Sequence, residues 1–95
     1  MNRQEPRQAL RTIKFRAKIN LFRYSQFAFE KLVDEGVYEE DVKRAFSTAS
    51  LLETRGDRRD GTHYILRGFG MDESGLVLVC VLLRRMVEVV DLYWD

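Results

Sequence analysis

The first part of the sequence carries its apolar residues at helical spacing. From Pro6, which suits the first turn of a helix, Leu10, Ile13 and Ala17 follow the i, i+3, i+7 pattern of one buried face. On a helical wheel, most cations of this segment fall outside that face, within one sector of about 80°. These cations are Arg3, Arg7, Arg11, Lys14 and Lys18. The pattern predicts a basic amphipathic helix.

Two more helical segments follow before residue 50. Ser25 is a suitable N-cap for a helix over residues 26–35, and Gly36 is suited to end it in the left-handed conformation. A further helix is predicted over residues 39–47, where three acidic residues in the first turn favour the helix dipole. The apolar stripe expected to be buried on the first of these helices consists of Phe29, Leu32 and Val33.

Beyond residue 50 the pattern changes from helical spacing to strands. Strands are predicted over residues 51–55, 62–69, 76–83 and 87–94, with short polar or glycine-containing turns between them. The third of these segments is apolar on both faces, as a central strand covered on each side should be. The sequence therefore predicts one α+β domain over residues 1–95, with two to three N-terminal helices followed by a four-stranded antiparallel meander.

Composition and charge narrow the possible cellular locations of the protein. The chain has 95 residues, of which 45% are hydrophobic and 33% charged, and its longest apolar run is far shorter than the roughly 20 residues that a membrane helix needs. Cys80 is the single cysteine, so an internal disulfide is excluded and a reducing, cytoplasmic location is expected. The net charge is +1, but residues 1–25 hold seven cations and one acid, giving 7 − 1 = +6 and leaving 1 − 6 = −5 for the rest.

The segment Gly61-Thr62-His63-Tyr64-Ile65-Leu66-Arg67-Gly68 carries the strongest candidate for chemistry. Strand alternation places His63 and Arg67 on one face, and Tyr64 on the other. Arg55 on the preceding strand is expected to join the first face, depending on the register. Such a cluster suits the binding of a phosphodiester and the stabilisation of its developing charge without a metal. The alternative is a solvated strand face with scattered charges.

Phe27 and the basic helix are candidate binding elements. Phe27 lies on the polar side of its helix, either covered by another element or exposed as a base-stacking or partner-binding surface. The basic helix has the geometry to follow a phosphate backbone, although a solvated face or a docking strip for an acidic partner explains it nearly as well. One histidine and one cysteine in an apolar run cannot form a zinc site, and neither a nucleotide-binding loop nor a cofactor is predicted.

Several short segments are similar to a known group of bacterial proteins. They are Tyr24 to Leu32, Glu35-Gly36-Val37, Glu40-Asp41-Val42, Thr62 to Gly68 and the final Val-Val-Asp-Leu-Tyr. Together they resemble small domains related to the MqsR and RelE/ParE toxins. The resemblance covers most of the chain from about residue 8 onward, and its order of elements matches the pattern described above.

The resemblance implies a metal-independent endoribonuclease that binds RNA and is held inactive by a cognate antitoxin protein. Arg67 matches the arginine before the family's glycine, Tyr64 matches the aromatic residue of that strand, and Lys31 stands where the family usually has arginine. Two positions depart from the family: Phe27 replaces a common histidine, and Glu35 replaces the arginine of an Arg-Gly pair. His63 is then the remaining group suited to proton transfer. The alternative is a catalytically inactive member of this fold that binds protein or RNA.

Overall fold

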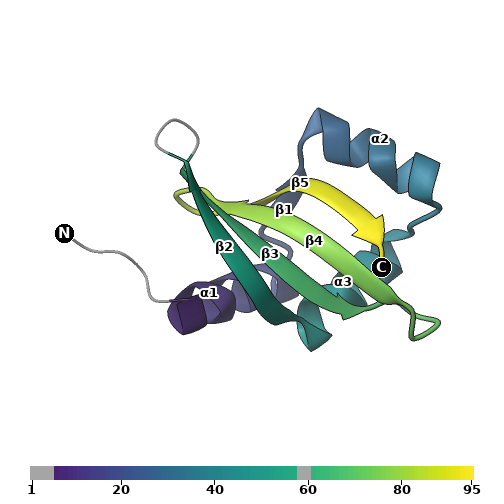
Figure 1. Ribbon diagram of the computed structural model, residues 1–95, viewed down its shortest axis with the longest axis horizontal. Helices are drawn as coiled ribbons and strands as arrows, with labels where there is room; N and C mark the ends of the chain where they lie inside the picture. The colour runs from purple at the N-terminus through teal and green to yellow at the C-terminus, as the bar shows by residue number, and fades with distance from the viewer. Residues whose placement is uncertain (1–5, 58–60) are drawn as a thin grey trace.

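The change from helix to strand near residue 50 is present in the structure, a computed structural model that describes residues 6–57 and 61–95 (Figure 1). The α+β class is confirmed, with three helices in the described part of the chain. The elements in chain order are α1 (Pro6–Lys18), β1 (Phe22–Tyr24), α2 (Gln26–Glu35), α3 (Glu39–Thr48), β2 (Ser50–Asp57), β3 (Gly61–Phe69), β4 (Gly75–Leu82) and β5 (Val87–Trp94).

The sheet differs from the predicted four-stranded antiparallel meander. It has five strands in the order β1-β5-β4-β3-β2, and it is mixed, because β1 pairs with β5 in parallel. Backbone hydrogen bonds extend this pair at both ends, from Val87 N to Leu21 O (3.0 Å) and from Ser25 N to Val89 O (2.9 Å). With three residues, β1 is too short to show the alternation by which strands are recognised in a sequence.

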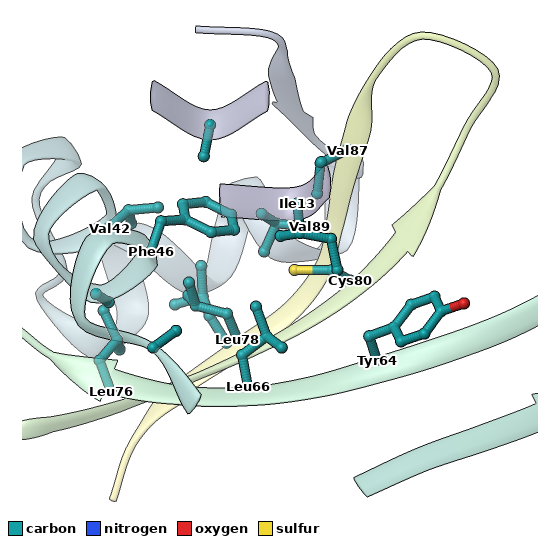
Figure 2. Packing of buried hydrophobic residues seen from close by; sticks show 14 of the residues in the cluster. Ile13, Val42, Phe46, Tyr64, Leu66, Leu76, Leu78, Cys80, Val87 and Val89 are labelled. Atoms are coloured by element: carbon teal, nitrogen blue, oxygen red, sulfur yellow. The ribbon is translucent and has the colours of Figure 1, made fainter. Parts of the chain in front are cut away.

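The hydrophobic core lies between one face of the sheet and the helices α1 and α3 (Figure 2). The cross-strand partners Leu66 and Leu78 point into it from β3 and β4, and both are fully buried. Ile13 of α1 and Phe46 of α3 meet them from the helical layer. Burial of apolar surface on this scale is the main stabilising contribution to a domain of this size.

Gly68 sets how closely α3 approaches the sheet. A Cβ atom at this position would lie 2.0 Å from the carbonyl oxygen of Ala45, which is backbone of α3. No side-chain rotation can relieve such a contact, so the absence of a Cβ allows the helix to pack directly on β3. The close packing holds α3 beside α1 on the same face of the sheet.

Helix α2 has the predicted bounds but buries a different face. Ser25 is its N-cap, accepting a hydrogen bond from Ala28 N at 3.1 Å, and Gly36 ends it in the left-handed conformation, so both capping predictions are confirmed. The predicted buried stripe is wrong for two of its three residues, because Phe29 is 60% exposed and Val33 is 77% exposed.

The reason lies in where α2 packs. The helix lies apart from α1 and α3 (Figure 1) and packs against β5 and β1. Ala28 is its fully buried residue, and Leu32 packs against the core from the next turn. The indole nitrogen of Trp94 on β5 donates to Glu35 O at 2.7 Å and fixes the end of the helix. A small residue, Ala28, therefore forms the contact that the sequence pattern assigned to larger ones.

Candidate nucleic-acid interface

The two faces of β3 are divided as alternation predicts. Tyr64 and Leu66 belong to the face that packs on the core, whereas His63 and Arg67 lie on the opposite face and are half-buried. Lys31 reaches this second face from α2, because it contacts Tyr93 of β5. Tyr93 pairs with Val77 of β4, and Val77 pairs with Arg67 of β3, so Tyr93 and Arg67 lie on the same face of the sheet. The structure thus places three of the predicted catalytic residues on one side of the sheet.

Arg67 is held in place by three groups around its guanidinium. Its Nε donates to Asp95 Oδ2 at 2.5 Å, and its guanidinium carbon lies 5.5 Å from the ring centre of Phe69. The guanidinium also packs over Gly75, where a Cβ atom would lie 2.3 Å from it. The positive charge that the ribonuclease prediction requires is therefore compensated by a carboxylate.

Lys31 is compensated in a similar way. Its Nζ lies 3.5 Å from Asp91 Oδ1 and 5.8 Å from the ring centres of both Phe27 and Tyr93. Phe27 itself is 58% exposed, which agrees with the interpretation of it as a surface aromatic residue. Lys31 therefore forms a local cluster with Phe27, and its ammonium group is partly neutralised.

His63 and Arg55 form a separate pair farther along the sheet. They are cross-strand partners on β3 and β2, and Arg55 Nε bonds to Glu53 Oε2 at 2.8 Å. This bond raises the pKa of the Arg55 guanidinium. His63 is four residues from Arg67 on β3, which corresponds to roughly 13 Å along a strand. A single phosphate cannot easily contact both residues at that separation.

Tyr64 does not join the other candidates. It is 8% exposed and lies on the helix-covered face, at the margin of the core, with its hydroxyl directed away from the core cluster (Figure 2). Strand alternation places its side chain on the face of the sheet opposite Arg67. A role for Tyr64 in the same site as Arg67 is therefore inconsistent with the structure.

The predicted basic helix is present as α1, although its cations do not all behave alike. Arg3 lies outside the described residues. Arg7, Arg11 and Lys18 are exposed, and none of them forms an ion pair within the described part of the chain. Lys14 is half-buried, and its Nζ donates to Ala49 O at 3.0 Å, which ties α1 to the end of α3. Lys14 is therefore a fixed charge, whereas the other three are held less tightly.

Arg16 holds a second group of cations next to this helix. The sequence pattern does not reveal this group. Its Nη1 donates to Leu83 O at 2.9 Å and to Met86 O at 3.3 Å, and its Nη2 donates to Arg84 O at 3.3 Å. These bonds hold the turn between β4 and β5 against α1. Arg84 and Arg85, both exposed in this turn, are thereby placed beside the cations of the helix.

Phe15 lies between two concave surfaces, each of about 580 Å³, and is 62% exposed. The first, the lysine pocket, is lined by Lys14, Phe15, Ala17, Lys18, Asn20, Lys43, Phe46 and Ser47. The second, the arginine groove, is lined by Arg11, Thr12, Phe15, Arg16, Leu21, Arg84 and Arg85. No carboxylate lines either one among the described residues. The only ion pair of a lining cation in this part of the chain joins Lys43 Nζ to Glu39 Oε2 of the same helix, at 3.7 Å.

We call this region the basic surface, defined by Arg11, Lys14, Arg16, Lys18, Lys43, Arg84 and Arg85. The sequence pattern had singled out three of these cations on the basic helix, namely Arg11, Lys14 and Lys18. The other four cations come together only through the fold: Arg16, Lys43, Arg84 and Arg85. The one signal of this surface in the sequence is Phe15, an aromatic residue among the cations on the polar side of the helical wheel.

Other kinds of site are not formed by the described residues. No group of three or more metal-ligating side chains occurs in residues 6–57 and 61–95, and no helix there is both long and apolar enough to cross a membrane. Cys80 is fully buried, and desolvation raises the pKa of its thiol, which suppresses the reactive thiolate form.

Comparison with known proteins gave no match to a family model, to a curated protein or to a solved structure. The resemblance to the MqsR and RelE/ParE toxins therefore stays a prediction.

Proposed function

We propose that this protein binds single-stranded RNA through the basic surface. The observation that supports the proposal is the convergence of seven cations from α1, α3 and the β4–β5 turn around the exposed ring of Phe15, with no carboxylate among the lining residues. A positively charged surface that follows the phosphate backbone, combined with an aromatic side chain for base stacking, is the usual arrangement in proteins that bind single strands. On the other face of the sheet, Arg67, Lys31 and Arg55 each form an ion pair with a carboxylate, whereas within the described residues Lys43 is the one cation of the basic surface that does so.

The proposal predicts a strong dependence on salt. If five of the seven cations contact phosphates, the logarithm of the association constant should fall against the logarithm of salt concentration with a slope of about −3.5. The measurement is fluorescence anisotropy of a labelled single-stranded RNA at several salt concentrations. A wild-type protein that shows no binding at about 50 mM salt, a concentration at which such contacts are strong, would contradict the proposal.

A matched pair of double variants locates the interaction. Arg84→Glu with Arg85→Glu changes the net charge by −4 on the basic surface, and Arg23→Glu with Arg55→Glu makes the same change elsewhere on exposed residues that already pair with carboxylates. We expect the first pair to weaken RNA binding more than 10-fold and the second to weaken it less than about 3-fold, because the phosphate contacts are short-ranged at moderate salt. Equal losses in the two variants would show that only net charge matters.

Metal-independent cleavage of RNA is a second candidate function. The observation in its favour is that His63, Arg67 and Lys31 lie on one face of the sheet, together with the aromatic residues Phe69 and Tyr93. The ion pair of Arg67 with Asp95 and the strand distance to His63 both weigh against a single reaction centre. Incubation of RNA with the protein in a chelator tests this function. New 5′ ends that disappear in Arg67→Ala, but persist in the Arg84 and Arg85 double variant, would favour it.

A further inference from the structure

The lysine pocket has the chemistry to accept one nucleotide of the bound strand. Its apolar part consists of Phe15, whose ring is exposed, and of Ala17 and Phe46, which are buried. Its cations are Lys14 and Lys18 of α1 and Lys43 of α3. An exposed aromatic ring in one pocket with three lysines matches a ligand with a flat apolar part and an anionic part.

The dimensions of the pocket support the same ligand class. A volume of about 580 Å³ lies within the range of about 300–1,000 Å³ typical of sites for small ligands, and it exceeds what an isolated phosphate requires. Phosphate alone would also leave the exposed ring of Phe15 in contact with water. A purely apolar ligand would remove the lysine ammonium groups from water without compensation, which is unfavourable. A nucleotide satisfies both parts, because its base covers the ring of Phe15 while its phosphate contacts the lysines.

The polar residues of the pocket offer hydrogen-bonding groups to a nucleotide. Lys14 donates one hydrogen bond to Ala49 O, which fixes its ammonium group and leaves two of its three donors for a phosphate. Asn20, which has a positive φ of 64° and follows the end of α1, lines the pocket together with Ser47 of α3. An amide and a hydroxyl can hydrogen-bond to a base edge or a ribose hydroxyl.

We propose that the lysine pocket receives an unstacked base of single-stranded RNA, which stacks on Phe15, while Lys14, Lys18 and Lys43 hold the adjoining phosphate. This inference rests on the proposed function, and it adds that the base is recognised as well as the backbone. The arginine groove on the other side of Phe15 continues the path of the strand, because Arg11, Arg84 and Arg85 lie there at the same exposed ring.

The test compares a single-stranded RNA of eight uridines with the same strand lacking all of its bases. Removal of the bases should weaken binding to the wild-type protein about 5- to 150-fold, which is the range expected for the loss of one stacked base. In Phe15→Leu, which keeps an apolar side chain but removes the ring, the two strands should bind with nearly equal affinity. Phe29→Leu is the matched control, because Phe29 is also about 60% exposed but lies on α2, away from the basic surface.

The outcomes separate this inference from the proposed function. Equal affinity of the wild-type protein for the two strands would show that binding uses the backbone alone, and the inference would be overturned while the proposed function stands. Discrimination retained in Phe15→Leu would also overturn it, and loss of discrimination in Phe29→Leu instead would place base recognition on α2. If neither strand binds the wild-type protein, the proposed function itself fails. Circular dichroism of each variant checks that it is folded. We expect both variants to fold, because both substituted positions are exposed.

Discussion

Replacement of Gly68 by alanine tests the packing that places α3, and therefore Lys43 and Ser47, beside α1. The added Cβ atom would lie 2.0 Å from Ala45 O and 2.7 Å from Ala45 C, both of which are backbone atoms. Ordinary van der Waals contact begins at 3.4 Å, so the two elements must move apart at this point. Because the clash is with the backbone, the separation requires a shift of the helix or the strand.

The energetic consequence follows from the residues nearby. Separation of α3 from the sheet loosens the packing of Phe46 and Val42, which are 2% and 0% exposed, against Leu66. Overpacking a core typically costs about 1–3 kcal/mol, and the partial loss of apolar contacts adds to that cost. We therefore expect the free energy of unfolding to fall by about 3 kcal/mol. For a domain of this size, that loss corresponds to a decrease in Tm of roughly 12 to 24 °C.

Gly56→Ala on β2 is the matched control for this substitution. A Cβ atom at Gly56 has no neighbour within 4 Å, and neither glycine has a positive φ, so the change in chain entropy is similar at both positions. We expect Gly56→Ala to be neutral, or to stabilise the protein by up to about 1 kcal/mol. Urea unfolding followed by circular dichroism gives both values. A difference of less than about 0.5 kcal/mol between the two variants, the size of effect that an ordinary surface substitution has, would show that α3 does not press on β3 at Gly68.

Further predictions concern groups in the core and at element ends. The Tyr24 hydroxyl is buried with no hydrogen-bond partner among the described protein groups, so Tyr24→Phe should raise the free energy of unfolding by about 1 kcal/mol in urea titrations, and a loss would contradict this assignment. Burial raises the pKa of both Tyr24 and Cys80, so the unfolded state ionises first as the pH rises. Stability should fall above about pH 9 through Cys80 and above about pH 10 through Tyr24, by up to about 1.4 kcal/mol per pH unit for each group. Cys80→Ala should make the stability–pH profile measured by urea unfolding between pH 8 and 10 less steep, whatever its effect on absolute stability, and an unchanged slope would count against this cause. Ser25→Ala should lower the free energy of unfolding by about 1 kcal/mol through loss of the α2 cap, a change measured against Gln26→Ala as the control. Arg67→Ala should change it by less than about 1 kcal/mol in the same assay, because its ion pair with Asp95 is partly exposed.

The sequence was informative wherever local chemistry decides the structure. The bounds of α2 follow from Ser25 and Gly36, because a side-chain cap and a left-handed residue act within one helical turn. The β5 strand follows from its apolar pattern, and its predicted range of residues 87–94 agrees with the structure. The pairing of β1 could not be found in this way, since its hydrogen bonds depend on β5, the last strand of the chain, where Val87 is the register partner of Phe22.

The candidate site shows the same division between local and long-range information. Alternation along β3 correctly separated Arg67 from Tyr64, but only the fold shows that Asp95 compensates the charge of Arg67. The pattern of α1 identified a basic helix, whereas the contribution of Arg84 depends on a hydrogen bond from Arg16 to a turn near the other end of the chain. The sequence could therefore predict in part which charges lie together on one helix or strand, but not which charges from different elements lie together.

The position of β5 in the sheet has a consequence for how the protein acquires its structure. This strand occurs last among the elements but lies between β1 and β4, so it completes the sheet by joining two edges. Until it is in place, β4 presents an unpaired apolar edge (GLVLVCVL), which is the type of segment that associates with other chains. The β4–β5 pair closes through the short turn of residues 83–86, whereas the pairing of β5 with β1 joins Phe22 to Val87 and forms more slowly, because a long loop must close first. Until β1 pairs with it, β5 is itself the edge of the sheet, and this interval is the later stage at which the chain is exposed to aggregation.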